Sequence, residues 1–376
     1  MTLFPMTKPR LGLSITGKMM GMAEIHRVWK HPIFQRYHEL PISSDSVRPS
    51  PIAANLTNLE ELRNILRALR QHTSRPRTIA LCLPDLCARS TVFRFASLPS
   101  SPSEREAIIA GRFQQDCKLS PSNVRIAYRL YHTQEKTVHD TEQTMPVLYV
   151  LAVAIQRDII ESYEALCLEA GLVPASISLA GLAVFDLCRA AMDHATQAVS
   201  ANVPLNKHEA FFLFLADWGF LLLMLRDGHP TFLRVKSLPM WLQPDSLSSE
   251  TAHVPLEKTD EALTVALSTH TMNLVANELI ATIQYYVETV EPRVASDEHP
   301  TKASPLFLVG SPLPEQTLPQ IGQTIERLLA DNRDAVPLLY PIPLHSGTEG
   351  LSGTAFSWLR TCSGTALSPF AATVVS

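Results

Sequence analysis

Two glycine-containing turns between apolar segments are the part of this chain whose residue types could do chemistry. Residues 11–17 and residues 214–219 each contain an apolar run, and each is followed by another. A strand–turn–strand of this kind lets backbone N–H groups approach a phosphate, and an aspartate beside it organises a metal ion and water. A third apolar run, residues 306–310, also ends in glycine. The pattern indicates a nucleotide-phosphate site whose members would be Gly17, Asp217, Gly219 and Gly310.

Several residues in and beside these turns oppose that chemistry. Ser14 stands where a phosphate loop of this kind needs an aspartate, and Thr16 stands where it needs another glycine. Phe220 is bulky, and Pro312 has no N–H to offer. We therefore interpret the site as vestigial and expect no catalytic residue, no metal and no required cofactor. Binding of Mg-ATP is the alternative.

Asp217 itself admits two interpretations. It could bind a metal ion, or it could end a strand and serve only the turn. The second is favoured, because one carboxylate rarely holds Mg²⁺ without phosphates. Gly17 fits an ordinary turn at least as well as a phosphate contact. The sequence contains no HExxH zinc motif and no GxSxG nucleophile motif that would point to other chemistry.

The segments that must position these residues repeat one order of elements. Three strands are expected within residues 10–40, a helix over 59–69 and a strand over 78–83. The same order is expected again later, with strands near residues 211, 220, 231 and 306 and helices over 273–289 and 315–330. Three strands, a helix and a strand are typical of a ribonuclease-H-like unit. The predicted fold class is therefore α/β, with two such halves facing a central cleft.

A third unit interrupts the first half. Residues 91–155 contain strand and helix patterns outside the repeated order and predict a small inserted α+β subdomain. The polar stretch 199–208 reads as a boundary, which gives halves 1–198 and 209–376. Residues 133–145 are polar and predict a mobile hairpin loop inside the insertion.

The composition describes a folded chain without a nucleic-acid or membrane-spanning signature. Of the 376 residues, 46% are hydrophobic and 18% charged, and the formal net charge is −4, which gives no reason to expect nucleic acid. The six cysteines form no CxxC pair and no zinc spacing, so we expect free thiols in a reducing compartment. The most apolar run, residues 211–225, is too short to span a bilayer. We expect a cytoplasmic protein that docks on a membrane through a partner.

Taken in order, several stretches resemble the PilM family, the actin-like and FtsA-like proteins of type IV pilus assembly. The resemblance covers about residues 10–370 and rests on residues 11–25, 95–131, 170–174, 214–225, 232–234 and 277–286. Two departures stand out. The family has Asp-Ile-Gly where this chain has Ser14-Ile15-Thr16, and Gly-Gly where it has Gly310-Ser311.

The resemblance implies an actin-like fold with an FtsA/PilM-type insertion. It also implies a scaffold, and not an enzyme, in a type IV pilus or related type II secretion platform, peripheral to the inner membrane. The partner would be the N-terminal cytoplasmic tail of a PilN-like single-pass membrane protein, with other platform proteins as neighbours. Two alternatives stay open: an active actin-like or sugar-kinase-like ATPase, and the L-type cytoplasmic component of type II secretion.

In the resembled family the tail lies in a groove between the first half and the insertion. Transferred to this chain, the groove would be lined by Arg89, Phe93, Arg94, Phe95 and Leu98. Apolar anchors and basic groups together suit an extended peptide, whose backbone could bond to a strand edge. In the competing interpretation, Phe93 and Phe95 alternate along a strand and simply face the core of the insertion.

Overall fold

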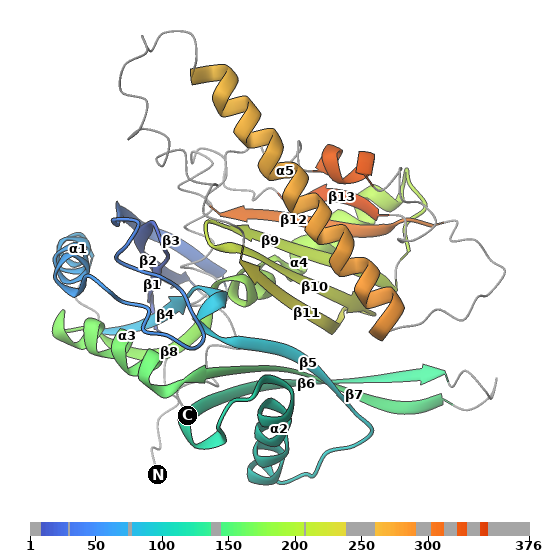
Figure 1. Ribbon diagram of the computed structural model, residues 1–376, viewed down its shortest axis with the longest axis horizontal. Coiled ribbons are helices and arrows are strands. Elements are labelled where there is room, and N and C mark those ends of the chain that lie inside the picture. The colour runs from blue at the N-terminus through green and yellow to red at the C-terminus, as the bar shows by residue number, and fades with distance from the viewer. Residues whose placement is uncertain are drawn as a thin grey trace.

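A computed structural model gives the structure of the chain. It describes residues 9–28, 31–73, 77–136, 144–206, 208–237, 260–290, 302–311, 322–328 and 339–344. Two five-stranded sheets and one three-stranded sheet organise these residues. Figure 1 shows the two larger sheets beside each other, with the smaller sheet below them.

The first large sheet has the strand order β3-β2-β1-β4-β8. Its strands are β1 (Leu11–Ile15), β2 (Met19–Val28), β3 (His31–Pro41), β4 (Thr78–Leu83) and β8 (Val173–Leu179). The first three form an antiparallel meander, while β4 lies parallel to β1 and β8 lies parallel to β4. The carboxyl ends of β1, β4 and β8 therefore meet at one edge of this sheet.

The second large sheet repeats this topology, with the order β11-β10-β9-β12-β13. Its strands are β9 (Glu209–Ala216), β10 (Gly219–Arg226), β11 (His229–Ser237), β12 (Ser304–Ser311) and β13 (Leu339–Pro343). Again an antiparallel meander is extended by two parallel strands. The same order and the same directions in both sheets confirm the predicted pair of ribonuclease-H-like halves.

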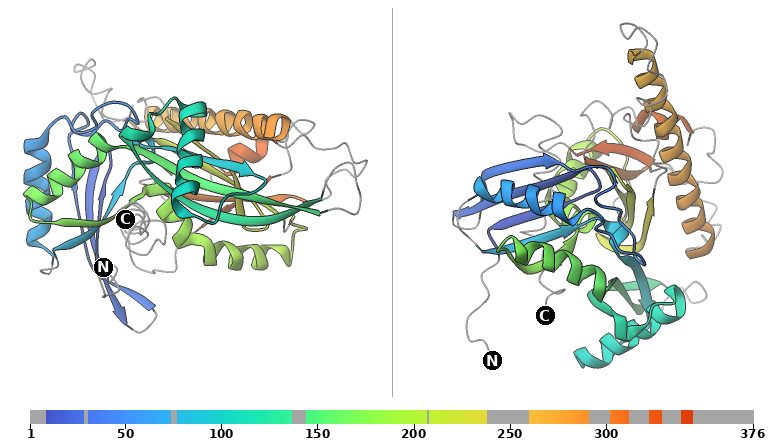
Figure 2. Two further views of the ribbon diagram at one scale, coloured as in Figure 1. Left: turned by 90° about the horizontal axis from the view of Figure 1, so that it is seen from below. Right: turned by 60° about the vertical axis from the view of Figure 1, so that its left-hand side comes forward.

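Helices cover the sheets and divide the core. In the first half, α1 (Leu59–Gln71) and α3 (Arg157–Glu169) lie side by side (Figures 1 and 2). The buried faces of α1, α3 and α4 (Ala180–Ser200) share one core with the first sheet, and this core continues onto one face of the second sheet. The other face of the second sheet packs against α5 (Asp260–Tyr285). One continuous core thus joins the halves.

The insertion is a separate sheet with one helix. The sheet order is β5-β7-β6, formed by β5 (Arg89–Phe95), β6 (Val124–Lys136) and β7 (Thr144–Gln156), and α2 (Pro102–Cys117) packs on it. Phe93 and Phe113 meet edge to face in its core, with ring centroids 5.1 Å apart. We keep the boundary 91–155 and the halves 1–198 and 209–376 as proposals.

The predicted loop 133–145 is wrong at both ends. The strands β6 and β7 stay paired as far as Lys136 opposite Thr144, so residues 133–136 and 144–145 belong to a long hairpin. Residues 137–143, the centre of the predicted loop, lie outside the described residues.

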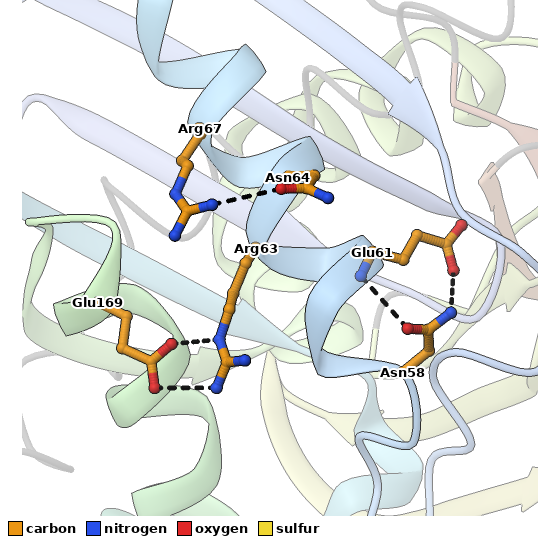
Figure 3. A network of polar contacts seen from close by, with 6 residues as sticks. All are labelled: Asn58, Glu61, Arg63, Asn64, Arg67 and Glu169. Carbon is orange, nitrogen blue, oxygen red and sulfur yellow. Dashed lines mark hydrogen bonds and ion pairs between the residues drawn. The ribbon is translucent and has the colours of Figure 1, made fainter.

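Helix ends show how local chemistry fixes element boundaries. The helix α3 ends as predicted at Gly171, which has φ +71°; Leu172 N–H reaches Cys167 O at 2.9 Å, and Gly171 N–H reaches Leu168 O at 2.8 Å. The start of α1 is fixed by a side-chain cap. Asn58 is the N-cap, and its side-chain oxygen accepts from the backbone N–H of Glu61 at 3.2 Å (Figure 3).

Two further boundaries differ from the predictions. The helix predicted over 273–289 begins earlier, at Asp260, and its last turn widens into a π-helix over Tyr286–Val290. The helix predicted over 315–330 is described only at residues 322–328. Among the helices that the structure describes, none is both long enough and apolar enough to cross a bilayer.

Candidate functional site

The two glycine turns of the sequence meet at the junction between the halves. A Cβ atom added to Gly17, in the turn after β1, would lie 3.6 Å from Oδ2 of Asp217, in the turn after β9. The same atom would lie 3.7 Å from the carbonyl oxygen of Val47. The fold therefore brings together the two residues, 200 positions apart, that the sequence singled out. The approach is close enough that no phosphate group fits between Gly17 and Asp217 at this point.

The turn after β1 is closed on itself by a threonine hydroxyl. Thr16 Oγ1 accepts from the backbone N–H groups of Lys18 and Met19, at 3.3 and 3.2 Å, and donates to the carbonyl oxygen of Met19 at 3.3 Å. In a phosphate loop, backbone N–H groups of the turn must point at the ligand. Here two of them already bond to Thr16. The turn is satisfied without a ligand, and its residues do not fit a nucleotide phosphate.

Asp217 is the unsatisfied member of the pair. Within the described part of the chain, neither carboxylate oxygen of Asp217 has a hydrogen-bond partner of normal geometry, because the nearby Thr16 hydroxyl donates to Met19 instead. Burial raises the pKa of Asp217 above its ordinary value, and Thr16 and Lys18 oppose that rise. Nor do the described residues bring three His, Cys, Asp or Glu side chains together as a metal site would need.

Gly219 serves the packing of the second sheet. Its φ is +149°, and a Cβ atom there would lie 2.0 Å from the carbonyl oxygen of Lys236 in β11. Only glycine allows β10 and β11 to approach this closely. Gly310 lies in β12, opposite Leu215 of β9. Strand geometry thus accounts for Gly219 without a phosphate.

Phe220 does not crowd the turns. Its side chain is fully buried in the core between the second sheet and α5, on the face away from the first half. Leu221, the next residue, faces the first half. The sequence could not assign these faces, because residues 220–225 are all apolar and give no alternation to read. Pro312 lies outside the described residues.

Two buried serines place polar side chains near the carboxyl edge of the first sheet. Register places Ser14 of β1 opposite Cys82 of β4, and Cys82 opposite Ser178 of β8. Ser14 and Ser178 are nearly fully buried, and within the described residues neither hydroxyl has a hydrogen-bond partner. A row of small polar side chains therefore crosses the sheet one residue before its carboxyl edge. Ser14 fills the place of the missing aspartate without offering a charge.

The sequence analysis missed a buried carboxyl group at the same junction. Asp85 follows β4 after one intervening residue, Pro84, and is 0% exposed. Its Oδ2 accepts from the backbone N–H of Gly181, in the first turn of α4, at 2.8 Å, while its Oδ1 has no partner within the described residues. Burial raises the pKa of Asp85 to about 7, against the opposing hydrogen bonds from the backbone at Gly181 and Leu182. The two residues lie 96 positions apart, and no local pattern could have paired them.

Gly181 brings the second half against this carboxyl group. A Cβ atom on Gly181 would lie 2.9 Å from Leu221 Cδ1 and 3.1 Å from both Phe214 Cδ1 and Asp85 Oδ1. The first turn of α4 therefore fits between the two sheets only because residue 181 is a glycine. Asp85 and Asp217 both lie at the junction of the halves, and each has at least one covered carboxylate oxygen without a hydrogen bond of normal geometry within the described residues.

The proposed groove residues divide between surface and core. Phe93 is 4% exposed and belongs to the core of the insertion, and Phe95 and Leu98 are half-buried against the same core. For Phe93, the structure matches the competing interpretation of the sequence. Arg89 and Arg94 are exposed. Beside them, β5 packs along β11 of the second half.

A salt bridge ties the insertion to the first half. Arg129 of β6 donates to both carboxylate oxygens of Asp186 in α4, at 2.9 and 3.2 Å. Arg129 also donates to the Tyr131 hydroxyl at 3.2 Å. Although burial works against the charged form, the bonds and charge of Asp186 raise the pKa of Arg129. In the same region, Arg189 of α4 donates to Gly228 O in the second half at 3.3 Å.

Comparison with known proteins defines the class of fold. No protein-family model matches the chain, and no curated protein sequence matches it. A chain of the PilM–PilN type IV pilus biogenesis complex superposes with a TM-score of 0.60 and 15% identity, over 96% of this chain and 100% of that one. The protein has the actin-like ATPase fold, and its architecture is PilM-like.

Two other solved structures align over most of the chain with lower scores. The cytoplasmic domain of EpsL, an inner membrane component of the Vibrio cholerae type II secretion system, gives a TM-score of 0.38 at 9% identity, over 94% of this chain and 93% of that one. The ethanolamine utilization protein EutJ from Carboxydothermus hydrogenoformans gives 0.42 at 11% identity, over 97% and 91%.

Proposed function

We propose that this protein is a non-hydrolysing scaffold of a type IV pilus or related secretion platform. The observation that carries the proposal is the turn after β1, where Thr16 occupies two N–H groups of Lys18 and Met19. Phosphoryl transfer needs open donors and a carboxylate that positions the nucleophile. With these donors occupied and Ser14 in place of an acid, the protein keeps the strand and turn arrangement of the fold but not the groups that hydrolysis needs.

The similar structure comes from a complex of PilM with PilN, and this suggests the kind of partner. We propose that the protein binds the N-terminal tail of a PilN-like single-pass membrane protein. Such a tether would hold the scaffold at the cytoplasmic face of the inner membrane, with other platform proteins as neighbours. Fold similarity alone does not transfer a partner, so this step needs its own experiment.

The insertion and the first half would supply the binding groove. Because Phe93 is taken up by the core of the insertion, the groove residues at the surface are the exposed Arg89 and Arg94 and the half-buried Phe95 and Leu98. Basic groups at the rim and partly covered apolar groups below them suit an extended tail with acidic and apolar residues.

A titration with the tail peptide tests the proposal. The full chain should bind the N-terminal peptide of its candidate membrane partner, and the Arg89→Glu, Arg94→Glu double variant should bind it at least tenfold more weakly. A matched control reverses Arg48 and Arg157, two exposed arginines outside the proposed groove. Unchanged affinity in the groove variant, or an equal loss in the control, would place the partner elsewhere.

The active ATPase stays the second candidate for the same fold. Its supporting observation is the unpaired Asp217 carboxylate, which is directed at the turn after β1. A hydrolase would show phosphate release that depends on Mg-ATP and disappears in an Asp217→Ala variant. The scaffold shows no release in either form.

A further inference from the structure

The basic residues of the chain are concentrated in one part of it. Residues 1–84 contain twelve Lys and Arg against five Asp and Glu, whereas the whole chain has 32 against 36. Residues 62–84 contain five arginines and no acidic residue at all. A protein with a formal charge of −4 thus has one strongly positive region, which is a feature that favours an anionic partner.

The fold gathers part of this charge at one edge of the first sheet. Arg10 immediately precedes β1, and Arg77 immediately precedes β4, which runs parallel to β1. Arg36 of β3 lies opposite Glu24 of β2, which lies opposite Leu11 at the start of β1. All three arginines therefore lie at the amino edge of the parallel strands. Gly17 and Asp85 lie at the carboxyl edge, which faces the second half.

The helices bring more positive charge to the same edge. The helix α1 ends just before β4 begins, so its last turn lies at the amino edge of the sheet, together with His72. His72 stacks on His38 of β3, with ring centroids 4.7 Å apart. Burial lowers the pKa of His38, and the neighbouring His72 and Arg36 lower it further. Among the residues that the structure describes, Arg67, one turn before the end of α1, bonds to Asn64 alone, at 3.3 Å (Figure 3).

These arginines are available for an external partner. We name the basic end as the surface formed by Arg10, Arg36, Arg67 and Arg77. All four side chains are exposed, and within the described part of the chain none of them forms an ion pair. Arg63 differs, because it is paired with Glu169 of α3 (Figure 3).

Two exposed aliphatic side chains accompany the basic end. Val173, at the start of β8, is 46% exposed, and its backbone N–H bonds to the carbonyl oxygen of Arg77 at 2.6 Å. Leu168, in the last turn of α3, is 55% exposed. Positive charge spread over several elements, with apolar side chains among it, fits the headgroup region of a bilayer better than it fits one peptide strand.

We propose that the basic end binds an anionic membrane surface directly. The contact is electrostatic, with Leu168 and Val173 reaching the boundary between headgroups and acyl chains. It orients the first half with its amino edge on the membrane and the junction of the halves facing away. This proposal goes beyond tethering through a partner tail and does not depend on it.

Vesicle sedimentation with the full chain tests this proposal. The protein should sediment with vesicles of 30% phosphatidylglycerol in phosphatidylcholine, remain in solution with phosphatidylcholine alone, and be released by high salt. Each arginine near an anionic surface contributes about a fivefold factor in affinity, so the Arg10→Gln, Arg36→Gln, Arg77→Gln variant should bind about a hundredfold more weakly. A control replaces Arg48, Arg112 and Arg157, which are exposed elsewhere, and should bind like the original protein.

Three outcomes would overturn the proposal. They are equal sedimentation with neutral vesicles, an equal loss in the control variant, and capture of an acidic peptide such as polyglutamate without any vesicle binding. Retained salt-sensitive binding in the triple variant would also place the membrane contact elsewhere. The tail-peptide titration should be unchanged in the triple variant, so failure here and failure of the proposed function are separately visible.

Discussion

Two aspartates at subdomain junctions, Asp186 and Asp217, have covered carboxylate groups with opposite surroundings. Asp186 joins the insertion to α4 and is held by two hydrogen bonds from Arg129. Asp217 joins the two halves, and within the described residues neither of its oxygens has a hydrogen bond of normal geometry, although Thr16 and the backbone at Lys18 lie close enough to favour its charged form. A buried charge without a partner is costly, and proteins usually avoid it. The insertion junction is therefore built for stability, and the junction of the halves keeps a polar group that stability does not require.

Asp85 extends this contrast. Its side chain is fully buried, and its carboxylate accepts from backbone N–H groups, that of Gly181 at 2.8 Å among them, in place of the two bonds that an arginine gives Asp186. The junction of the halves therefore contains two carboxyl groups whose folded state favours the protonated form. In an active member of this fold, ligand groups would compensate such carboxylates. The proposed loss of ligand binding would leave both carboxyl groups without that compensation.

Removing Arg129 from its salt bridge with Asp186 should have the largest effect on stability. We expect Arg129→Ala to lower the free energy of unfolding by about 3–5 kcal/mol, because Asp186 would remain buried and uncompensated. Urea denaturation measures this directly. The Arg129→Met, Asp186→Leu double variant should recover most of the loss. A loss below about 1 kcal/mol for Arg129→Ala would contradict the contrast between the junctions.

The Asp85 carboxyl group should make stability depend on pH. Its folded pKa of about 7 lies above the ordinary value of 3.8. The protonated Asp85 carboxyl group therefore makes its full contribution to the free energy of unfolding below about pH 4. This contribution is lost as pH rises through about 7. We expect Asp85→Asn to flatten this slope, because the amide oxygen can still accept from Gly181. Thermal unfolding from pH 5 to pH 8 would show it, and an identical slope in both proteins would argue against a raised pKa.

The unpaired carboxylate of Asp217 should be dispensable for folding. We expect Asp217→Asn to leave the free energy of unfolding at pH 8 unchanged or raised by about 1 kcal/mol, because a neutral amide is less costly to bury than a charge. Asp186→Asn is the matched comparison and should destabilise, since it weakens the bonds to Arg129. A clear loss of stability in Asp217→Asn would reveal a partner that holds the charge.

The sequence predicted the frame of the molecule better than its contacts. Glycine turns and apolar runs specify the strand–turn–strand units, and the Gly171 stop is local chemistry, so the two halves and the end of α3 could be predicted. Gly17 and Asp217 were singled out, and they do meet. The face of Phe220 could not be predicted, because an unbroken apolar strand gives no alternation. The Asp85–Gly181 bond could not be predicted either, because it depends on how two distant elements dock.

Mg-ATP titration tests the central claim, that the frame of an ATPase remains here without its chemistry. We predict that calorimetry with Mg-ATP shows no binding at micromolar affinity and that no phosphate is released, in the original protein and in Asp217→Ala alike. Micromolar binding accompanied by turnover that Asp217→Ala abolishes would contradict the account and identify an active enzyme.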